Sequence, residues 1–244
     1  MKLEDLQKGE KHEKIMVYGN SGAGKTVFAS SFPGPIYFCD FDGKISSAAS
    51  YLSKNNPEKI KEIEFEDFTD KTKAKGIRPY QSFLKKITEL EGEVKSNKYK
   101  TVVIDSLTTL SDAMMEDIIV SNPGVKGPVP GVPGMQHYLL LSFQFKQLIK
   151  RLLALPCNVV MLGHIKVDKD EVTSRIVYRP MLSGQLPEQI PILLEEVYRA
   201  YVEVKDGKTS YLAQTQAAGG YVARTQKQNI PSIIELKYES IKGK

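Results

Sequence analysis

Apolar residues follow two patterns along the chain, and the first consists of short continuous runs. These runs are rich in β-branched and aromatic residues and occupy residues 14–19 (KIMVYG), 35–40 (PIYFCD), 100–106 (KTVVIDS) and 157–164 (CNVVMLGH). Because they are continuous rather than alternating, they predict strands that are buried on both faces, as in a parallel sheet.

The second pattern has helical spacing and lies between the strand runs. Residues 80–94 are the clearest example, since their apolar positions share one helix face. Similar stretches occupy residues 24–32, 107–119 and 135–155. The alternation of strand and helix predicts an α/β fold with a mainly parallel central sheet flanked by helices.

After residue 170 the pattern changes. Residues 175–180 (RIVYRP) and 195–216 read as strands, with a hairpin signal at Asp206 and Gly207. They predict antiparallel strands added to the edge of the same sheet towards the C-terminus. We therefore expect a single domain over residues 1–244, with residues 1–13 as a polar N-terminal extension.

One segment fits neither pattern. Residues 121–134 (SNPGVKGPVPGVPG) contain four glycines and four prolines, a composition that excludes a helix or a central strand. A Gly/Pro-rich loop of this length is expected to have a function or to lack order.

Composition changes this picture only slightly. The net charge of +5 is compatible with phosphate-containing partners but too small to establish them. Cys39 and Cys157 both lie in apolar runs, which indicates buried thiols in a reducing compartment rather than a disulfide. No stretch resembles a signal peptide or a membrane span, so we expect a cytoplasmic protein with no membrane partner.

Residues 19–26 (GNSGAGKT) match the phosphate-binding pattern G-x-x-x-x-G-K-[ST] between a predicted strand and a predicted helix. In such a loop the backbone N–H groups surround the phosphates, Lys25 reaches the β- and γ-phosphate oxygens, and Thr26 binds Mg²⁺. The alternative is a glycine-rich turn that matches by chance. The predicted ATP-contacting residues are Gly19, Asn20, Ser21, Gly22, Ala23, Gly24, Lys25, Thr26 and Val27.

Carboxylates end two of the predicted strands. Asp105 ends the strand at 100–106, where it could hold Mg²⁺ through water, although Asp105 or Ser106 could instead cap the next helix. Asp40 and Asp42 end the strand at 35–40 and, being one residue apart, are expected to point the same way, so that either could reach the γ-phosphate as a base. A simple acidic turn is the alternative.

In their order along the chain, GNSGAGKT, FCDFDG, VVIDSLTTL and VVMLGHIK resemble the RecA-like branch of P-loop ATPases. The resemblance is closer to phage-encoded RecA-like single-strand annealing proteins, because SGQLPEQIPILLEEVYR (183–199) is similar to their G-Q-L-P motif and the strand after it. It spans about residues 14–230 and implies that the strand ending at His164 lies between the P-loop strand and the strand ending at Asp105.

The resemblance also implies residue roles. His164, which alone would read as an ordinary strand end, becomes a sensor beside the γ-phosphate that relays nucleotide state to the segment after it. Asp42 takes the place of the catalytic carboxylate, where relatives commonly have Glu; its shorter side chain implies slow ATP hydrolysis, with Asp40 as the fallback base.

By the same resemblance, residues 121–134 and 165–185 correspond to two DNA-binding loops. For any single cationic residue in or after these loops, a position on the solvated surface is at least as good an explanation as a DNA contact. The candidates for DNA contacts are Lys126, Lys166, Lys169, Arg175 and Arg179. His137 and Tyr138 could stack a base or could belong to the core.

RecA-like ATPases hydrolyse ATP between subunits, and Arg224 and Lys227 are the candidates for a cation supplied to a neighbour in a ring or filament. The expected function is a Mg²⁺-dependent ATPase that binds single-stranded DNA and promotes annealing or strand exchange in phage recombination, in the host cytoplasm. A single-strand-binding protein is a candidate partner. The alternatives are a small-molecule kinase and a nucleotide-switched loader for a helicase or a single-strand-binding protein.

Overall fold

The structure is a computed structural model that describes residues 11–69, 76–170 and 173–242. Its centre is an eight-stranded sheet with the strand order β10-β9-β8-β1-β5-β4-β2-β3. The strands are β1 (Lys14–Gly19), β2 (Ile36–Asp40), β3 (Ile63–Asp67), β4 (Thr101–Asp105), β5 (Asn158–Gly163), β8 (Glu196–Lys205), β9 (Lys208–Gln214) and β10 (Ile233–Glu235).

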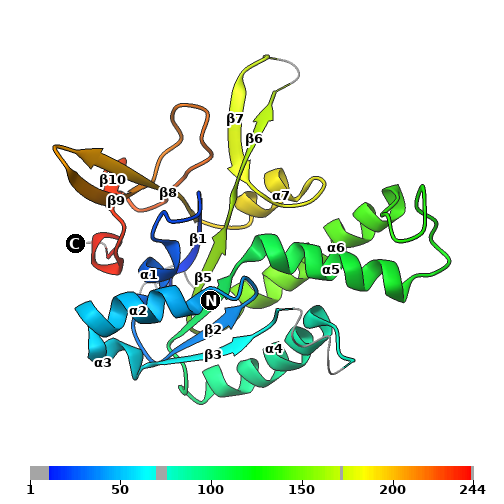
Figure 1. Ribbon diagram of the computed structural model, residues 1–244, viewed down its shortest axis with the longest axis horizontal. Helices are drawn as coiled ribbons and strands as arrows, with labels where there is room; N and C mark the ends of the chain where they lie inside the picture. The colour runs from blue at the N-terminus through cyan, green and yellow to red at the C-terminus, as the bar shows by residue number, and fades with distance from the viewer. Residues whose placement is uncertain (1–10, 70–75, 171–172, 243–244) are drawn as a thin grey trace, which may run out of the picture.

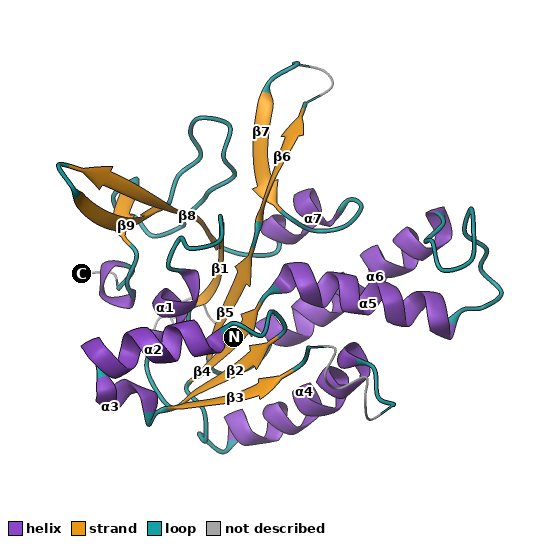
Figure 2. Ribbon diagram, viewed as in Figure 1, coloured by secondary structure: helices purple, strands orange, loops and turns teal. Residues whose placement is uncertain are grey.

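Helices cover both faces of this sheet (Figure 2). They are α1 (Lys25–Ser30), α2 (Ile45–Asn55), α3 (Pro57–Ile60), α4 (Pro79–Lys95), α5 (Leu107–Ser121), α6 (Met135–Leu153) and α7 (Leu186–Ile192), with a 3-10 turn at Tyr238–Ser240. No helix among the described residues is long and apolar enough to cross a membrane.

The core has two parts, one on each face. Along β1, Met16 and Tyr18 face the cluster formed with α4 to α7, whereas Ile15 and Val17 face the cluster that includes α1 and the C-terminal segment. All four side chains are fully buried. The continuous apolar runs therefore arise, as predicted, from strands that are covered on both faces.

Six strands of this sheet run parallel, in the order β8-β1-β5-β4-β2-β3, so that β5 lies between β1 and β4. This confirms the predicted α/β fold with its mainly parallel sheet, and it agrees with the strand order that the resemblance implied. Because parallel strands end at one edge, the residues that end β1, β2, β4 and β5 meet there.

The C-terminal strands differ from prediction in the direction of β8, whereas the predicted turn is present. β8 is parallel to β1, because α7 returns the chain to the end of the sheet where β1 begins; antiparallel pairing in this sheet is confined to β9, which pairs with β8 and β10. The hairpin at Asp206 and Gly207 is present, and both residues have positive φ, at 50° and 71°.

Residues 175–180 do not join the main sheet. β7 (Ile176–Pro180) pairs instead with β6 (Ile165–Lys169) as a separate antiparallel hairpin. We call β6 and β7 the arm, because they project away from the sheet in Figure 1. The residues of β6 have intermediate or high exposure, and only its first residue, Ile165, packs against the core.

The paired helices α5 and α6 project on another side of the molecule and carry residues 122–134 between their ends (Figure 1). This segment contains neither helix nor strand, as its glycines and prolines predicted. Both cysteines are free and buried.

Candidate functional site

The loop between β1 and α1 has the shape expected of a phosphate-binding loop. Gly22 and Gly24 have φ values of 78° and 83°, a backbone region that L side chains rarely adopt. The side chain of Lys25 is folded into the loop, where its ammonium donates hydrogen bonds to the carbonyls of Gly19 (2.9 Å) and Asn20 (2.8 Å). Burial lowers the pKa of Lys25, and the carboxylates of Asp105 and Asp42 oppose that shift.

At two positions of the motif, close packing also requires glycine. A Cβ on Gly19 would lie 2.2 Å from the carbonyl oxygen of Ala200 in β8, so the close approach of β1 and β8 excludes a side chain there. A Cβ on Gly24 would lie 2.9 Å from the ring of Tyr211. Gly19 and Asn20 hold Lys25 through their carbonyls, whereas residues 21–27 line the cavity described below.

Asp105 and Thr26, at the ends of β4 and the P-loop, form a hydrogen-bonded pair. The Thr26 hydroxyl donates to Oδ2 of Asp105 at 2.7 Å, and Asp105 is 6% exposed. Burial raises the pKa of Asp105 to about 6; Asp42 and Asp40 add to this shift, and the Thr26 hydroxyl and Lys25 oppose it. Ser106, and not Asp105, caps α5 by accepting a hydrogen bond from the Thr109 N–H.

This pair fits magnesium. Mg²⁺ is usually held by one or two protein oxygen ligands, waters and substrate phosphates rather than by a cage of side chains. Thr26 and Asp105 present a hydroxyl and a carboxylate beside the phosphate loop, and the described residues contain no group of three or more His, Cys, Asp or Glu side chains that would form a cage.

Asp40 and Asp42 have different surroundings. Asp40 accepts hydrogen bonds from four backbone N–H groups, those of Asp42, Gly43, Lys44 and Ile45, at 2.8–3.3 Å. The expectation that both carboxylates point the same way is wrong, because β2 ends at Asp40 and Asp42 already lies in the turn that Asp40 organises. Asp42 lines the cavity, and Asp40 is not among the lining residues.

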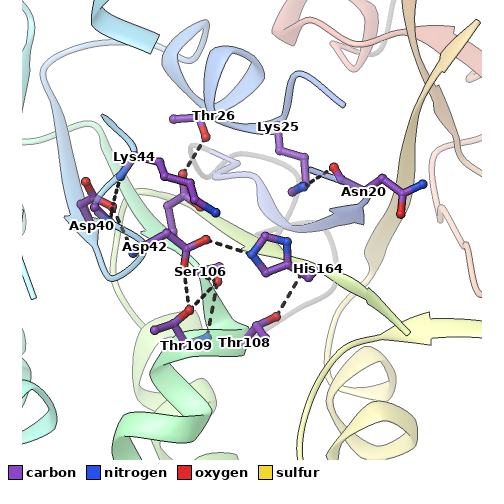
Figure 3. Close-up of polar contacts among 12 residues, drawn as sticks. Asn20, Lys25, Thr26, Asp40, Asp42, Lys44, Ser106, Thr108, Thr109 and His164 are labelled. Carbon is purple, nitrogen blue, oxygen red and sulfur yellow. Dashed lines mark hydrogen bonds and ion pairs between the residues drawn. The ribbon is translucent and has the colours of Figure 1, made fainter. Parts of the chain in front are cut away.

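The carboxylate of Asp42 is surrounded by donors. It accepts hydrogen bonds from the hydroxyls of Ser106 (3.0 Å) and Thr109, and it lies 2.9 Å from Nε2 of His164 (Figure 3). Burial alone would raise its pKa, but the hydrogen bonds from His164, Thr109 and Ser106 outweigh burial and lower the pKa to about 2. Asp42 is therefore a carboxylate at neutral pH.

His164 touches both the site and the arm. Its ring contacts Asp42, its N–H donates to the Thr108 hydroxyl at 3.1 Å, and its carbonyl accepts from the N–H of Met181 at 2.8 Å. Met181 directly follows β7. His164 is thus the point where the arm leaves the site.

These residues open onto a cavity of about 1140 Å³, large enough for a nucleotide. One wall is the P-loop with Asp42, Asp105 and His164, and the other walls come from α2, α3, β9 and the residues after β10. Sequence reasoning missed the rest of its lining, which includes Lys44, Tyr51 and Tyr211. The position of Lys44 two residues after Asp42 was a usable signal, whereas nothing in the sequence places Tyr211 near the P-loop.

The predicted DNA-contacting residues are not brought together. Lys126 lies between α5 and α6, on a different side of the molecule from the arm that carries the other four (Figure 1). On the arm, Lys166 is paired with Asp168 at 3.0 Å and Arg179 is paired with Glu188. Lys169 and Arg175 are exposed.

The two candidates for base stacking have different surroundings, and so do the two candidates for a finger. His137 is buried, and its Nδ1 accepts a hydrogen bond from Gly134 at the start of α6, which makes it a capping residue rather than a base-stacking one; Tyr138 is 40% exposed. The ammonium of Lys227 is bound within its own chain by Glu13 (2.6 Å) and by the carbonyl of Ile241 (2.7 Å). This contact opposes a role for Lys227 in a neighbour's site. Arg224 has an intermediate exposure, and its backbone bridges to Val197 of β8.

In a comparison with known protein families, residues 11–227 match a family described as an AAA domain. The matched range includes the P-loop, Asp42, Asp105, His164 and the arm. Comparison with the curated proteins finds no match.

Proposed function

We propose that this chain, which belongs to the AAA domain family and is a P-loop ATPase, uses its nucleotide state to control the binding of single-stranded DNA by the arm. The observation that carries the proposal is the position of His164, whose ring contacts Asp42 in the cavity and whose backbone holds the residue after β7. A change at the γ-phosphate would therefore reach the arm through one residue.

In this proposal the residues of the cavity divide the work of binding and hydrolysis. Residues 21–27 surround the phosphates, and Lys25 exchanges its contacts with the Gly19 and Asn20 carbonyls for phosphate oxygens. Thr26 and Asp105 would hold Mg²⁺, which would neutralise charge on the phosphates. Asp42 orients the attacking water.

The low pKa of Asp42 supports slow hydrolysis. A carboxylate whose pKa is about 2 accepts a proton poorly at neutral pH, because an efficient general base has a pKa near the working pH. Asp42 would then act mainly by positioning water.

The RecA-like order of the motifs supports the finer part of the proposal, that the protein promotes annealing or strand exchange in phage recombination. β5 lies between β1 and β4 and ends at His164, where the RecA-like branch has its sensor. A role as a loader remains the second candidate, because the arm, with its exposed Val167 and Ile176, could also bind a protein.

Fluorescence anisotropy with a labelled oligonucleotide at low salt tests this function. We expect binding to single-stranded DNA to be tighter with a non-hydrolysable ATP analogue than with ADP, by about 5- to 150-fold, the usual range of coupling between two sites. Lys25→Ala should remove the difference between nucleotides. No oligonucleotide binding in any nucleotide state would exclude the proposal. Nucleotide binding without turnover, even with DNA present, would favour the loader.

A further inference from the structure

Lys44 is held at the cavity by a turn built around Asp40. The Asp40 carboxylate accepts hydrogen bonds from the N–H groups of Gly43 (2.8 Å) and Lys44 (3.3 Å). Gly43 reverses the chain with a φ of 67°. As a result the backbone of Lys44, just before α2, is fixed beside the end of β2 and close to Asp42.

From this position the side chain of Lys44 points into the cavity. In Figure 3 it extends towards the space between Lys25, Asp42 and His164. Lys44 lines the same cavity as these three residues. It is also close enough to Lys25 that, in addition to the effect of burial, its charge lowers the pKa of Lys25.

The ammonium of Lys44 is free to bind a ligand. Within the described part of the chain it forms no ion pair or hydrogen bond, whereas two other cavity lysines are neutralised. Lys59 pairs with Glu62 at 2.6 Å, and Lys237 pairs with Glu235 at 2.6 Å. Lys44 is therefore an unpaired cation beside Lys25, on the side of the cavity where Asp42 and His164 lie.

We propose that Lys44 binds the γ-phosphate in cis and stabilises the negative charge that develops during ATP hydrolysis. The water oxygen bonds to the γ-phosphorus while the bond to the β–γ bridging oxygen breaks, ADP leaves with that electron pair, and the water proton is released to solvent. Lys44 keeps its protons and acts by charge alone. The inference rests on the proposed hydrolysis at this site.

The position of Lys44 differs from that of the finger candidates that the sequence suggested. One of the two sequence-based finger candidates, Lys227, is held by Glu13 and the Ile241 carbonyl of its own chain. Lys44, by contrast, needs no second copy to reach the cavity.

The test compares steady-state ATP turnover of the full chain and its variants without DNA. We expect Lys44→Ala to lower kcat by about 10²- to 10³-fold, the scale of losing one charge-stabilising group. The affinity for ADP, which lacks the γ-phosphate, should change little. Lys44→Arg should recover part of the rate. Lys54→Ala is the matched control, since Lys54 lies at the other end of α2 and is not among the residues that line the cavity.

Two further measurements separate the outcomes. Mixing Lys44→Ala with Lys25→Ala, which retains Lys44, should not restore turnover; restoration would show that the cation acts in trans and overturn the inference. Wild-type turnover by Lys44→Ala would overturn it as well. If the wild-type chain does not hydrolyse ATP, the proposed activity fails; Lys44 is then tested by binding, because Lys44→Ala should still lose the preference for a non-hydrolysable ATP analogue over ADP.

Discussion

The hydrogen bond between His164 and Asp42 can exist in only one arrangement. Because the pKa of Asp42 is about 2, its carboxylate only accepts, so Nε2 of His164 must carry the proton. The imidazole then has one N–H fixed by Asp42. Any group that donates a hydrogen bond to the Asp42 carboxylate, such as an attacking water, competes directly with the His164 ring.

Substitution of His164 tests this competition. His164→Ala should keep ATP binding, because Lys25, Thr26 and Asp105 are unchanged, but it should reduce the ratio of single-stranded DNA affinities between the ATP-analogue and ADP states to about 1, the limit of no coupling. His164→Gln keeps a donor and should retain much of the ratio. Anisotropy titrations measure both ratios.

His12→Ala is the control, because His12 precedes β1 and does not line the cavity. A His164→Ala protein with the parent's ratio would show that the relay does not run through this ring.

Residue types in the sequence pointed to the P-loop, Asp42, Asp105 and His164, which lie together at the cavity, but not to how neighbouring residues divide their roles. Asp40 and Asp42 are chemically identical and one residue apart, and only the end of β2 decides that Asp40 binds backbone N–H groups while Asp42 faces the cavity. Lys227 was similarly ambiguous, because its partner Glu13 is far away in the sequence.

At the scale of elements, the arm is where sequence and structure differ most. The apolar runs of β1, β2, β4 and β5 were predictable because burial on both faces leaves a continuous pattern. β6 and β3 leave a weaker signal, since IKVDK and IEFED carry charges on alternate residues and neither strand has a fully buried position. A strand that lies at an edge or in a separate hairpin is not marked by its hydrophobicity.

The arm also makes the DNA proposal testable at the level of one element. Lys169 and Arg175 lie near its tip and are exposed. If each neutralises one phosphate, replacing both with Ala should weaken single-stranded DNA binding and reduce the slope of log affinity against log salt by roughly 1.4, at about 0.7 per contact. Titrations at several salt concentrations measure this slope.

The matched control replaces Lys85 and Lys150 with Ala; these two lysines are exposed on α4 and α6, away from the arm. An equal loss of affinity in both double variants would indicate a general charge effect and contradict a specific contact with the arm.

For the molecule as a whole, the family match and the sheet order agree on a P-loop ATPase, and the motif order in the sequence was sufficient to predict that fold. The cavity was not predictable as a whole. Its outer wall is formed by α2, β9 and the segment after β10. β9 and the segment after β10 meet the P-loop because β8 pairs with β1 and brings the C-terminal hairpin beside it.

Because the core covers both faces of the sheet and buries several ionisable groups, the free energy of unfolding should decrease at alkaline pH. Burial raises the pKa of Cys157 to about 11 and, together with Asp117, the pKa of Tyr80 to about 12. In the unfolded chain such groups ionise near about 8.5 and 10. Above these values the folded protein binds more protons than the unfolded chain, so the free energy of unfolding falls as the pH rises.

Lys14 and Lys25, whose pKa values burial lowers, act in the opposite direction. Burial lowers the pKa of Lys14 to about 8, so the folded chain binds fewer protons at Lys14 than the unfolded chain does, and the contribution of Lys14 to stability rises with pH from about 8 to about 10.4. Several other buried groups, among them Tyr18, Tyr37 and Tyr198, have raised pKa values and outnumber the two lysines. We therefore expect the net stability to fall between about pH 9 and pH 11.

Urea unfolding at a series of pH values measures this effect. The midpoint should decrease between about pH 9 and pH 11, and Tyr80→Phe, which keeps the ring but removes the ionisable hydroxyl, should make the decrease shallower above about pH 10. Tyr51→Phe is the control, because Tyr51 is 49% exposed and its removal should leave the slope unchanged. A midpoint that stays constant or rises over this range would show that Lys14, rather than the buried tyrosines and cysteines, dominates the alkaline response.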